Sequence, residues 1–216
     1  MQDANRLTFA LRLAIGPGVA SPFLSDLLAQ QRAEEPAVEL TIHETTAEEL
    51  LQGVMGGRYD IGIALTRSDT PSIRSEPLWI EEIGAAMPLH SPLLGCRPLT
   101  LKDLRGCPLY RWQAEQCPEL DQMLLALQQR TDQEVRQLAS LEMIALWVGA
   151  GYGIGLVRQS QAPRAHSWGT VMLPLSGGPY RVTTYLVQRA KKASPIGTRF
   201  EERAIQLARN RPDAFS

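Results

Sequence analysis

Apolar and polar residues alternate with two different periods along the first third of the chain, and these periods predict strands and helices in turn. Residues 11–15 form a short apolar run that predicts a strand, and leucines at helical spacing follow it to about residue 34. Ser21-Pro22 suits the start of that helix, because serine caps helices and proline is tolerated at the first helical position. Residues 38–43 then alternate with the period of a strand that has one wetter face.

The next residues continue this order of elements. Thr45 and Thr46 each have a glutamate three positions on, so both fit a capping box at the start of a second helix, which the glycine pair at 56–57 ends. Residues 60–65 are apolar enough for a central strand of a parallel sheet. Because the connections are short, this alternation predicts right-handed crossovers and an α/β fold with a parallel sheet.

The rest of the chain repeats the alternation less regularly. Strand-like runs occur at residues 80–87, 108–112, 135–138, 154–157, 171–175 and 180–188. Helices are predicted as a short turn from residue 100, a helix through residues 120–127, a helix capped by Ser140 and a last helix that begins at Ser194-Pro195.

Composition and charge narrow the classes of function. The 216 residues are 44% hydrophobic and carry 22 Lys and Arg against 23 Asp and Glu, without the basic excess of a protein that binds nucleic acid by itself. No apolar run approaches the roughly 20 residues of a membrane span, and no signal-peptide pattern opens the chain. Cys96, Cys107 and Cys117 are widely spaced, which favours reduced thiols. We therefore expect a cytoplasmic protein without a membrane partner.

Several catalytic and cofactor motifs fail on particular residues. The loop at residues 16–21 nearly matches a dinucleotide-binding turn, but Ser21 replaces its last glycine and Pro17 removes a backbone donor. The glycines of residues 149–155 follow a helix and precede a strand, the reverse of a phosphate loop. His43-Glu44 begins a zinc-protease motif that Ala47 breaks. The sequence thus predicts no cofactor, no metal and no enzyme.

Capped helix starts remain as candidate ligand groups. Ser21, Thr45-Thr46 and Ser140 are predicted to open helices, whose free N–H groups and dipoles favour a small anion such as a carboxylate. In open parallel sheets, ligands bind beyond the carboxyl ends of the strands, where the first two of these starts lie. Each hydroxyl taken alone also fits a plain helix cap.

Two further side chains follow predicted strands. Arg67 comes after the third strand and could hold a carboxylate with two parallel hydrogen bonds, although it also fits a solvated surface charge. Trp112 ends a later strand, where it could stack on an aromatic ligand or lie in the core.

Four segments, in this order, resemble the effector-binding domain of LysR-type transcriptional regulators: LRLAIGPGVASPFLSDLLAQQRAEEPAVELTIHE, TTAEELLQGVMGGRYDIGIAL, PLTLKDLRGCPLY and SLEMIALWVGAGYGIGLV. The likeness runs from about Leu11 to Ala208, and the second segment, a capped helix followed by GxxD and a strand, is the most telling. It implies two Rossmann-like lobes joined by crossover strands, as in type 2 periplasmic binding proteins. Lobe I would be residues 1–87 plus 189–216 and lobe II residues 88–188, together forming one effector-binding unit.

The resemblance also implies a function and a site. A ligand-sensing domain of this family binds a small effector in the cleft between its lobes and is not an enzyme. Its contacts would fall on Gly16, Pro17, Gly18, Val19, Ser21, Thr45, Thr46, Thr66, Arg67, Trp112 and Ser140. The chain departs from the family pattern in its first loop, which offers no hydroxyl before Ser21.

Partners follow from the same resemblance. The family forms homodimers in which the first helix and second strand of lobe I meet a lobe II helix of the partner, and a tetramer is open for a full-length protein. DNA would be bound only through a winged helix-turn-helix that has no counterpart in this chain, where residues 1–10 resemble the linker after it. A transport-type solute-binding protein of the same fold is the alternative, disfavoured by the lack of an export signal, and a small enzyme on this scaffold is a third.

Overall fold

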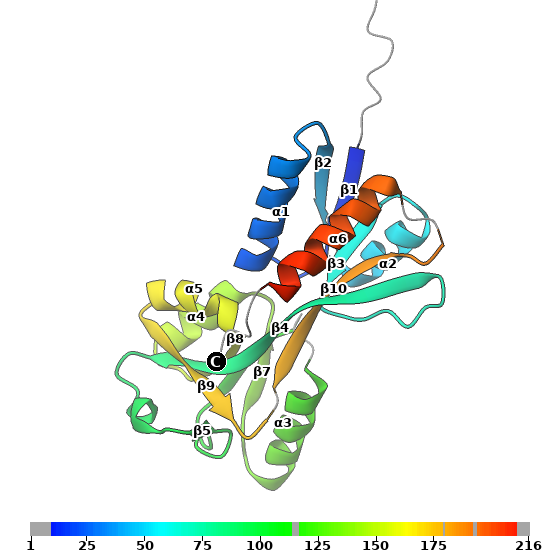
Figure 1. The fold of residues 1–216 in the computed structure, drawn as a ribbon. Coiled ribbons are helices and arrows are strands. Elements are labelled where there is room, and N and C mark those ends of the chain that lie inside the picture. Colours follow the sequence, from blue (N-terminus) through cyan, green and yellow to red (C-terminus); the bar gives the residue numbers. More distant parts are fainter. Residues whose placement is uncertain (1–9, 114–116, 179, 192–193, 211–216) are drawn as a thin grey trace, which may run out of the picture. The chain divides into compact units, whose positions relative to one another are not determined.

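The chain is a mixed α/β protein in a computed structural model that describes residues 10–113, 117–178, 180–191 and 194–210 (Figure 1). Its strands are β1 Ala10–Ile15, β2 Glu39–Glu44, β3 Ile61–Ala64, β4 Ile73–Pro88, β5 Leu99–Thr100, β6 Leu109–Trp112, β7 Val135–Leu138, β8 Ile154–Arg158, β9 Thr170–Ser176 and β10 Arg181–Arg189. Its α-helices are α1 Pro22–Glu34, α2 Ala47–Met55, α3 Pro118–Arg130, α4 Leu141–Gly149, α5 Ala162–Ser167 and α6 Pro195–Arg209, with 3-10 turns at Pro92–Gly95 and Gln159–Gln161. The linker-like segment, except for Ala10, lies outside the described residues.

The chain divides into two compact units. Unit 1 is Met1–Trp79 with Thr183–Ser216, and unit 2 is Ile80–Val182. The long strands β4 and β10 carry the chain from one unit to the other, and both boundaries lie a few residues before the ones expected from the sequence. Each boundary lies inside a continuous strand, and no glycine or proline stands at the boundary itself to indicate it in the sequence.

The sheet of unit 1 has the order β2-β1-β3-β10. Strand β1 pairs in parallel with β2 and with β3, so Leu13 lies opposite Ile42 on one side and Ile61 on the other. Strand β10 is antiparallel to β3. This arrangement confirms the parallel sheet predicted from the strand–helix alternation, with the fully buried β3 inside it and the wetter β2 at its edge.

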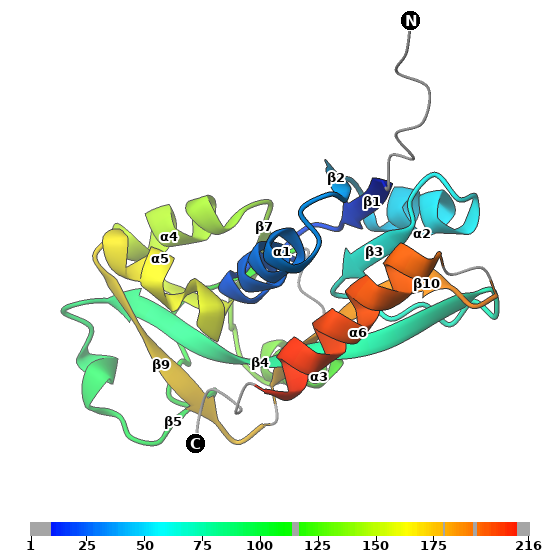
Figure 2. The ribbon, with the colours of Figure 1, turned by 45° about the horizontal axis from the view of Figure 1, so that its top comes forward.

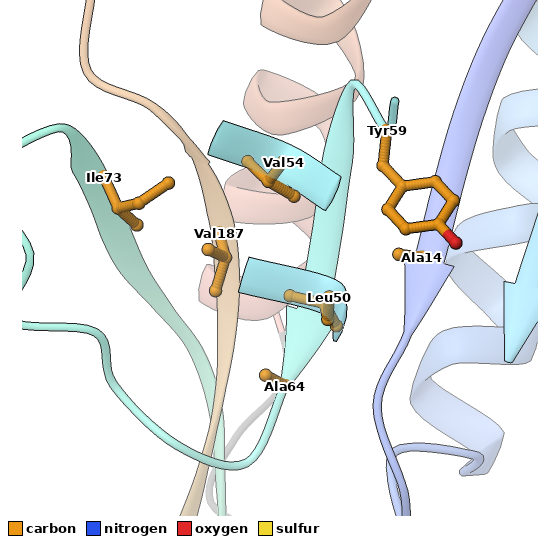
Figure 3. Close-up of a cluster of buried hydrophobic side chains, with 7 residues drawn as sticks. All are labelled: Ala14, Leu50, Val54, Tyr59, Ala64, Ile73 and Val187. Atoms are coloured by element: carbon orange, nitrogen blue, oxygen red, sulfur yellow. The ribbon is translucent and has the colours of Figure 1, made fainter. Parts of the chain in front are cut away.

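Helix α2 covers one face of this sheet (Figure 3). Leu50 and Val54, one turn apart, point into a cluster of buried side chains that comes from α2, the strands and the connecting turn: Ala14, Leu50, Val54, Tyr59, Ala64, Ile73 and Val187. The helix approaches β3 closely at Gly62, where an added Cβ would lie 2.4 Å from Leu50 Cδ2. A residue with a side chain at this position would have to displace the side chain of Leu50.

Helices α1 and α6 of unit 1 are held together by charge as well as packing. The buried guanidinium of Arg203 in α6 donates through Nε to Glu34 of α1 at 2.7 Å and also hydrogen-bonds Gln31. Arg199 pairs with Glu35. The hydrogen bond from Arg203 is the largest cause that lowers the pKa of Glu34, so this carboxylate stays charged well into the acidic range.

An ion pair fastens β1 to the start of β3. Arg12 donates to Asp60 through its backbone N–H at 2.9 Å and through two guanidinium nitrogens at 3.1 and 2.9 Å. Burial alone would raise the pKa of Asp60, but the hydrogen bonds and charge of Arg12 outweigh it and the pKa is lowered. The pair lies at the amino ends of the strands, away from the loops that carry the candidate site residues.

Unit 2 has a second sheet, in the order β4-β8-β6-β7. Strand β6 is parallel to both β7 and β8, while β4 is antiparallel to β8 and β9. Helix α4 packs on it through Ile144 and Val148, which join Ala86, Tyr110 and Val157 in one buried cluster. Gly155 on β8 permits this contact, because an added Cβ would lie 2.6 Å from Ile144 Cγ2.

Unit 2 also contains a buried ion pair. Arg158, at the end of β8, donates through Nη1 to Glu81 Oε2 of β4 at 2.8 Å, and the two side chains are 0% and 2% exposed. The other carboxylate oxygen accepts the backbone N–H of Ser160 at 3.1 Å. The pair therefore connects β4 to the turn that follows β8.

Two parts of the fold differ from the sequence-based predictions. Strand β4 begins at Ile73 rather than near residue 80, and helix α5 was not predicted. The short turn predicted from residue 100 does form: turns run over residues 101–106, and the Thr100 backbone nitrogen lies 2.8 Å from Asp103 Oδ2. Among the residues described, no helix combines the length and apolar character that crossing a bilayer requires.

Candidate functional site

The carboxyl ends of the parallel strands of unit 1 bring three of the predicted site segments together. The backbone N–H of Thr45, after β2, donates to the carbonyl of Ile15 at the end of β1 at 3.0 Å. The N–H of Gly16, after β1, donates to the carbonyl of Ile63 in β3 at 2.9 Å. The loops after β1, β2 and β3 therefore start from one row of hydrogen bonds along a single sheet edge.

The first of these loops is shaped by its glycines. An added Cβ on Gly16 would lie 3.4 Å from the carbonyl oxygen of Ile63, and Gly18 has a φ of +80°, a conformation that favours glycine. Pro17 is exposed, whereas the side chain of Val19 is fully buried. Val19 therefore contributes core packing and offers a ligand only its backbone.

Ser21 ends this loop and begins α1. Its Oγ accepts the backbone N–H of Leu24 at 3.4 Å, which is the capping role predicted from the sequence. The first helical position is Pro22, which has no N–H, and the N–H of Ser25 donates to the carbonyl of Ser21 at 3.1 Å. The first turn of α1 therefore offers an anion fewer donors than an ordinary helix start.

The second loop carries its own acidic partner. Thr46, not Thr45, is the N-cap of α2, and it forms the full capping box with Glu49. The Thr45 hydroxyl instead donates to Glu49 Oε2 at 2.6 Å. The hydrogen bonds from Thr45 and then Thr46 lower the pKa of Glu49, so the carboxylate is charged at neutral pH. A ligand carboxylate at this loop therefore has to displace Glu49 from Thr45 or bind the helix amides beside it.

The third loop provides an exposed cation. Thr66 and Arg67 follow β3 and both lie at the surface. The Arg67 Nε atom is 3.7 Å from Asp69 Oδ1, and the two side chains are 69% and 92% exposed. Such an exposed pair is weakly held, so the guanidinium is able to turn toward a ligand.

Unit 2 brings the other two predicted residues to one edge of its own sheet. Trp112 ends β6 opposite Leu138 of the parallel strand β7, and its indole Nε1 donates to the carbonyl of Ala139 at 2.9 Å. The next residue, Ser140, caps α4 by accepting the N–H of Met143 at 3.2 Å. Trp112 is half-buried against the cluster of unit 2, so part of its side chain belongs to the core, and its stacking on an aromatic ligand stays a prediction.

A cavity beside α4 in unit 2 was not predicted from the sequence. Its signal is the composition of α4, LEMIALWVG, which is apolar on nearly every side and exposes Leu146. The described residues contain no group of three or more His, Cys, Asp or Glu side chains that could hold a metal ion, and Cys96, Cys107 and Cys117 form no disulfide.

Comparison with known proteins places the sequence among regulators. The family profile described as the LysR substrate binding domain matches residues 5–208. The chain is 24% identical over 147 residues to a probable cat1 operon transcriptional activator of Acinetobacter lwoffii, which covers 66% of this chain and 48% of that protein. It is 32% identical over 98 residues to a probable hydrogen peroxide-inducible genes activator of Streptomyces viridosporus, covering 45% of this chain and 31% of that protein. The chain thus spans about half or less of the length of these relatives.

Solved structures show the same fold at low sequence identity. The BenM effector binding domain with its effector benzoate has a TM-score of 0.78 at 17% identity and covers 92% of this chain and 91% of its own. The effector binding domain of QuiR in complex with shikimate has a TM-score of 0.78 at 12% identity and covers 94% and 98%. These likenesses confirm the predicted α/β fold of the type 2 periplasmic-binding-protein kind. The match along nearly its whole length shows that the chain belongs to the LysR substrate-binding domain family.

Proposed function

We propose that the chain senses a small carboxylate effector for a LysR-type transcription regulator, and that the loops at the carboxyl edges of the unit 1 and unit 2 sheets carry the groups that bind it. The observation that carries this proposal is the shared edge in unit 1, where two capped helices and Arg67 follow adjacent parallel strands. The Trp112 and Ser140 pair at the equivalent edge of unit 2 supports it. Two of the similar solved structures contain benzoate and shikimate, and both of these ligands are small carboxylates.

The chemistry of these groups favours a singly charged anion with a ring. The amides that begin α2 offer hydrogen bonds and the positive end of a helix dipole. Arg67 adds a full charge, and Trp112 offers an aromatic face for the ring. The charged Glu49 beside Thr45 opposes a second negative group, so a dicarboxylate is expected to bind less tightly than a monocarboxylate.

The signal reaches DNA only if effector binding favours one of two arrangements of the protein. A ligand shifts such an equilibrium by its difference in affinity for the two states and by no more. We therefore propose that the effector binds unequally to two poses and that a DNA-binding part of a longer protein responds to them. This role places the chain in the cytoplasm, with no cofactor required.

Replacing Arg67 by alanine tests the effector site. A panel of monocarboxylates that includes benzoate and shikimate is screened by thermal shift, and the best binder is titrated by calorimetry. Arg67→Ala is expected to weaken its Kd about tenfold or more, because a hydrogen bond to a charged group is worth roughly 1.5–3 kcal/mol. The melting temperature should hardly change, because the side chain is exposed.

Thr45→Ala and Arg105→Ala complete this experiment. Thr45→Ala is expected to weaken binding too, whereas the exposed Arg105 of unit 2 is a matched control that leaves Kd unchanged. Absence of binding across the whole panel contradicts the proposal. So does a lower melting temperature with unchanged affinity in Arg67→Ala.

The same proposal includes a homodimer built from α1 and β2 of one copy and α3 of the other. A groove between α1 and β2 is lined by Leu28, Val38 and Leu40 among others, and α3 exposes 57% of Leu125. Leu125→Glu is therefore expected to turn a dimer into a monomer in light scattering. Leu146, a leucine on α4 that is 49% exposed, gives the control, and Leu146→Glu should remain dimeric. A monomeric wild-type chain at high concentration, or equal effects of both variants, contradicts this arrangement.

A further inference from the structure

Unit 2 contains a cavity that none of the residues assigned to the effector lines, although Leu141 and Glu142, which follow Ser140 in the chain, do line it. It has a volume of about 110 Å³ and is formed by α4, the α5–β9 segment and the strands beneath them. Helices α4 and α5 lie side by side in both views of the ribbon (Figures 1 and 2). Every described residue that lines the cavity belongs to unit 2.

The floor of the cavity is apolar and rigid. Ile144 and Val148 of α4 meet Ala86 of β4 and Val157 of β8 there, and each of these side chains is at most 3% exposed. All four belong to the buried cluster of the unit, so the cavity is a part of the core that side chains leave unfilled. Protein interiors are otherwise packed as densely as organic crystals, with few voids larger than a water molecule.

The mouth of the cavity differs from its floor. Trp168 lies at the rim with 48% of its surface exposed, and Glu142 is the only charged side chain among the described lining residues. Gly149 brings the rim close to α4, because an added Cβ there would lie 2.6 Å from the carbonyl oxygen of Trp168. The cavity therefore opens beside an aromatic face and a carboxylate, and the lining residues that the structure describes include no basic side chain.

We propose that this cavity is a second ligand site, which takes one apolar six-membered ring carrying a neutral or cationic substituent at the mouth. The cavity, at about 110 Å³, is smaller than the apolar cavity of about 150 Å³ that stays dry and binds benzene, so a single ring enters it with one edge in the open mouth. The open mouth leaves room for the substituent, and the Trp168 indole packs on the edge of the ring. Glu142 repels a carboxylate, so the site selects against the class of compound that we assign to the effector cleft.

Benzyl alcohol, benzylamine and benzoate form the matched set of probes for this site. They share one ring and differ in the charge of the substituent. Benzyl alcohol and benzylamine are expected to raise the melting temperature of the chain and to change its tryptophan fluorescence. Benzoate is expected to leave their binding at this site unaffected, since a ligand in the effector cleft does not occupy the cavity. The test therefore distinguishes a failure here from a failure of the effector proposal.

Filling the cavity provides the decisive variant. Ala145 lines it from α4, and Ala145→Leu places a larger side chain in the empty space, so the Kd for benzyl alcohol is expected to weaken at least tenfold. Ala150→Leu puts the same side chain at the exposed end of α4 and should leave Kd unchanged. Trp168→Ala, a change at a half-exposed residue that should not affect folding, is expected to weaken binding several-fold and to remove the fluorescence change.

Three results would overturn the proposal. One is the absence of any benzyl alcohol binding to the wild-type chain up to the solubility limit of the probe. Another is unchanged affinity in a folded Ala145→Leu or Trp168→Ala variant. The third is displacement of benzyl alcohol by benzoate with equal affinity, which would assign the ring to the effector cleft instead.

Discussion

Glu81→Gln is expected to lower the free energy of unfolding by about 3–5 kcal/mol, the cost of removing one partner from a buried ion pair. The glutamine is nearly the same size as the glutamate and keeps an oxygen for the Ser160 N–H. The main change is therefore the loss of the negative charge that faces the Arg158 guanidinium, whose side chain is 0% exposed. Urea unfolding at neutral pH, followed by circular dichroism, measures the effect.

The next residue of the same strand supplies the control. Glu82 pairs with Arg181 at 3.4 Å, and their side chains are 40% and 55% exposed. Because water and salt screen an exposed pair, Glu82→Gln is expected to cost less than about 1 kcal/mol. Equal losses in the two variants would contradict the assignment of Glu81 and Arg158 as a buried pair.

A double variant separates the effect of the two charges on stability from the effect of the volume of the two side chains. Glu81→Leu together with Arg158→Met leaves neither charge in the core and keeps much of the volume. Replacing a buried pair by apolar residues is often neutral or stabilising, so the double variant should be more stable than Glu81→Gln alone. A double variant that is as unstable as the single one would show that Arg158 and Glu81 act through contacts other than their mutual attraction.

The local elements of unit 1 could be predicted because their signals are local. Ser21 and Thr46 are capping residues beside regular apolar stripes, and both cap the helices they were expected to open. Strand β3 is a short apolar run buried on both faces. Each of these features depends on residues within a few positions of one another, which is the range that periodicity reports.

The first half of β4 could not be predicted for the opposite reason. Arg74, Glu76 and Pro77 interrupt the apolar pattern of residues 73–79. Arg74 is accommodated by an ion pair with Glu201 of α6, a residue far along the chain. Such a partner gives no sign in the local sequence, so the extended segment lacks the pattern of a strand.

Some features of the candidate site could likewise be predicted from the sequence, and others could not. The positions of the loops after β1, β2 and β3 follow from the order of the elements, and the structure brings these loops to one edge. Thr45 and Thr46 both match the capping-box pattern, so the sequence does not decide which of them caps α2. The structure shows that Thr46 is the cap and that the Thr45 hydroxyl donates to Glu49. The cavity beside α4 is a volume that residues from α4, β4 and β8 leave unfilled, and no short pattern encodes such a volume.

Leu50→Ala is expected to destabilise unit 1 by about 2–5 kcal/mol, the range for truncating a buried leucine. Leu50 is 0% exposed and lies in the buried cluster under α2 (Figure 3). It also lies against the glycine loop, because a Cβ built on Gly16 would be 3.6 Å from Leu50 Cδ1. The cavity left by the truncation thus lies beneath both the helix and the first loop of the candidate site.

A loss of binding should therefore accompany the loss of stability. If the loop after β1 holds the effector, Leu50→Ala is expected to weaken the Kd of the carboxylate identified in the panel as well as lower the midpoint of urea unfolding. Leu50→Met, which nearly conserves volume, should cost less than about 1.5 kcal/mol and retain affinity. Met55, on the same helix and 41% exposed, gives the surface control, and Met55→Ala should change neither quantity appreciably. A Leu50→Ala variant that loses stability but keeps full affinity would show that the loop holds its shape through its own glycines, independently of the core beneath it.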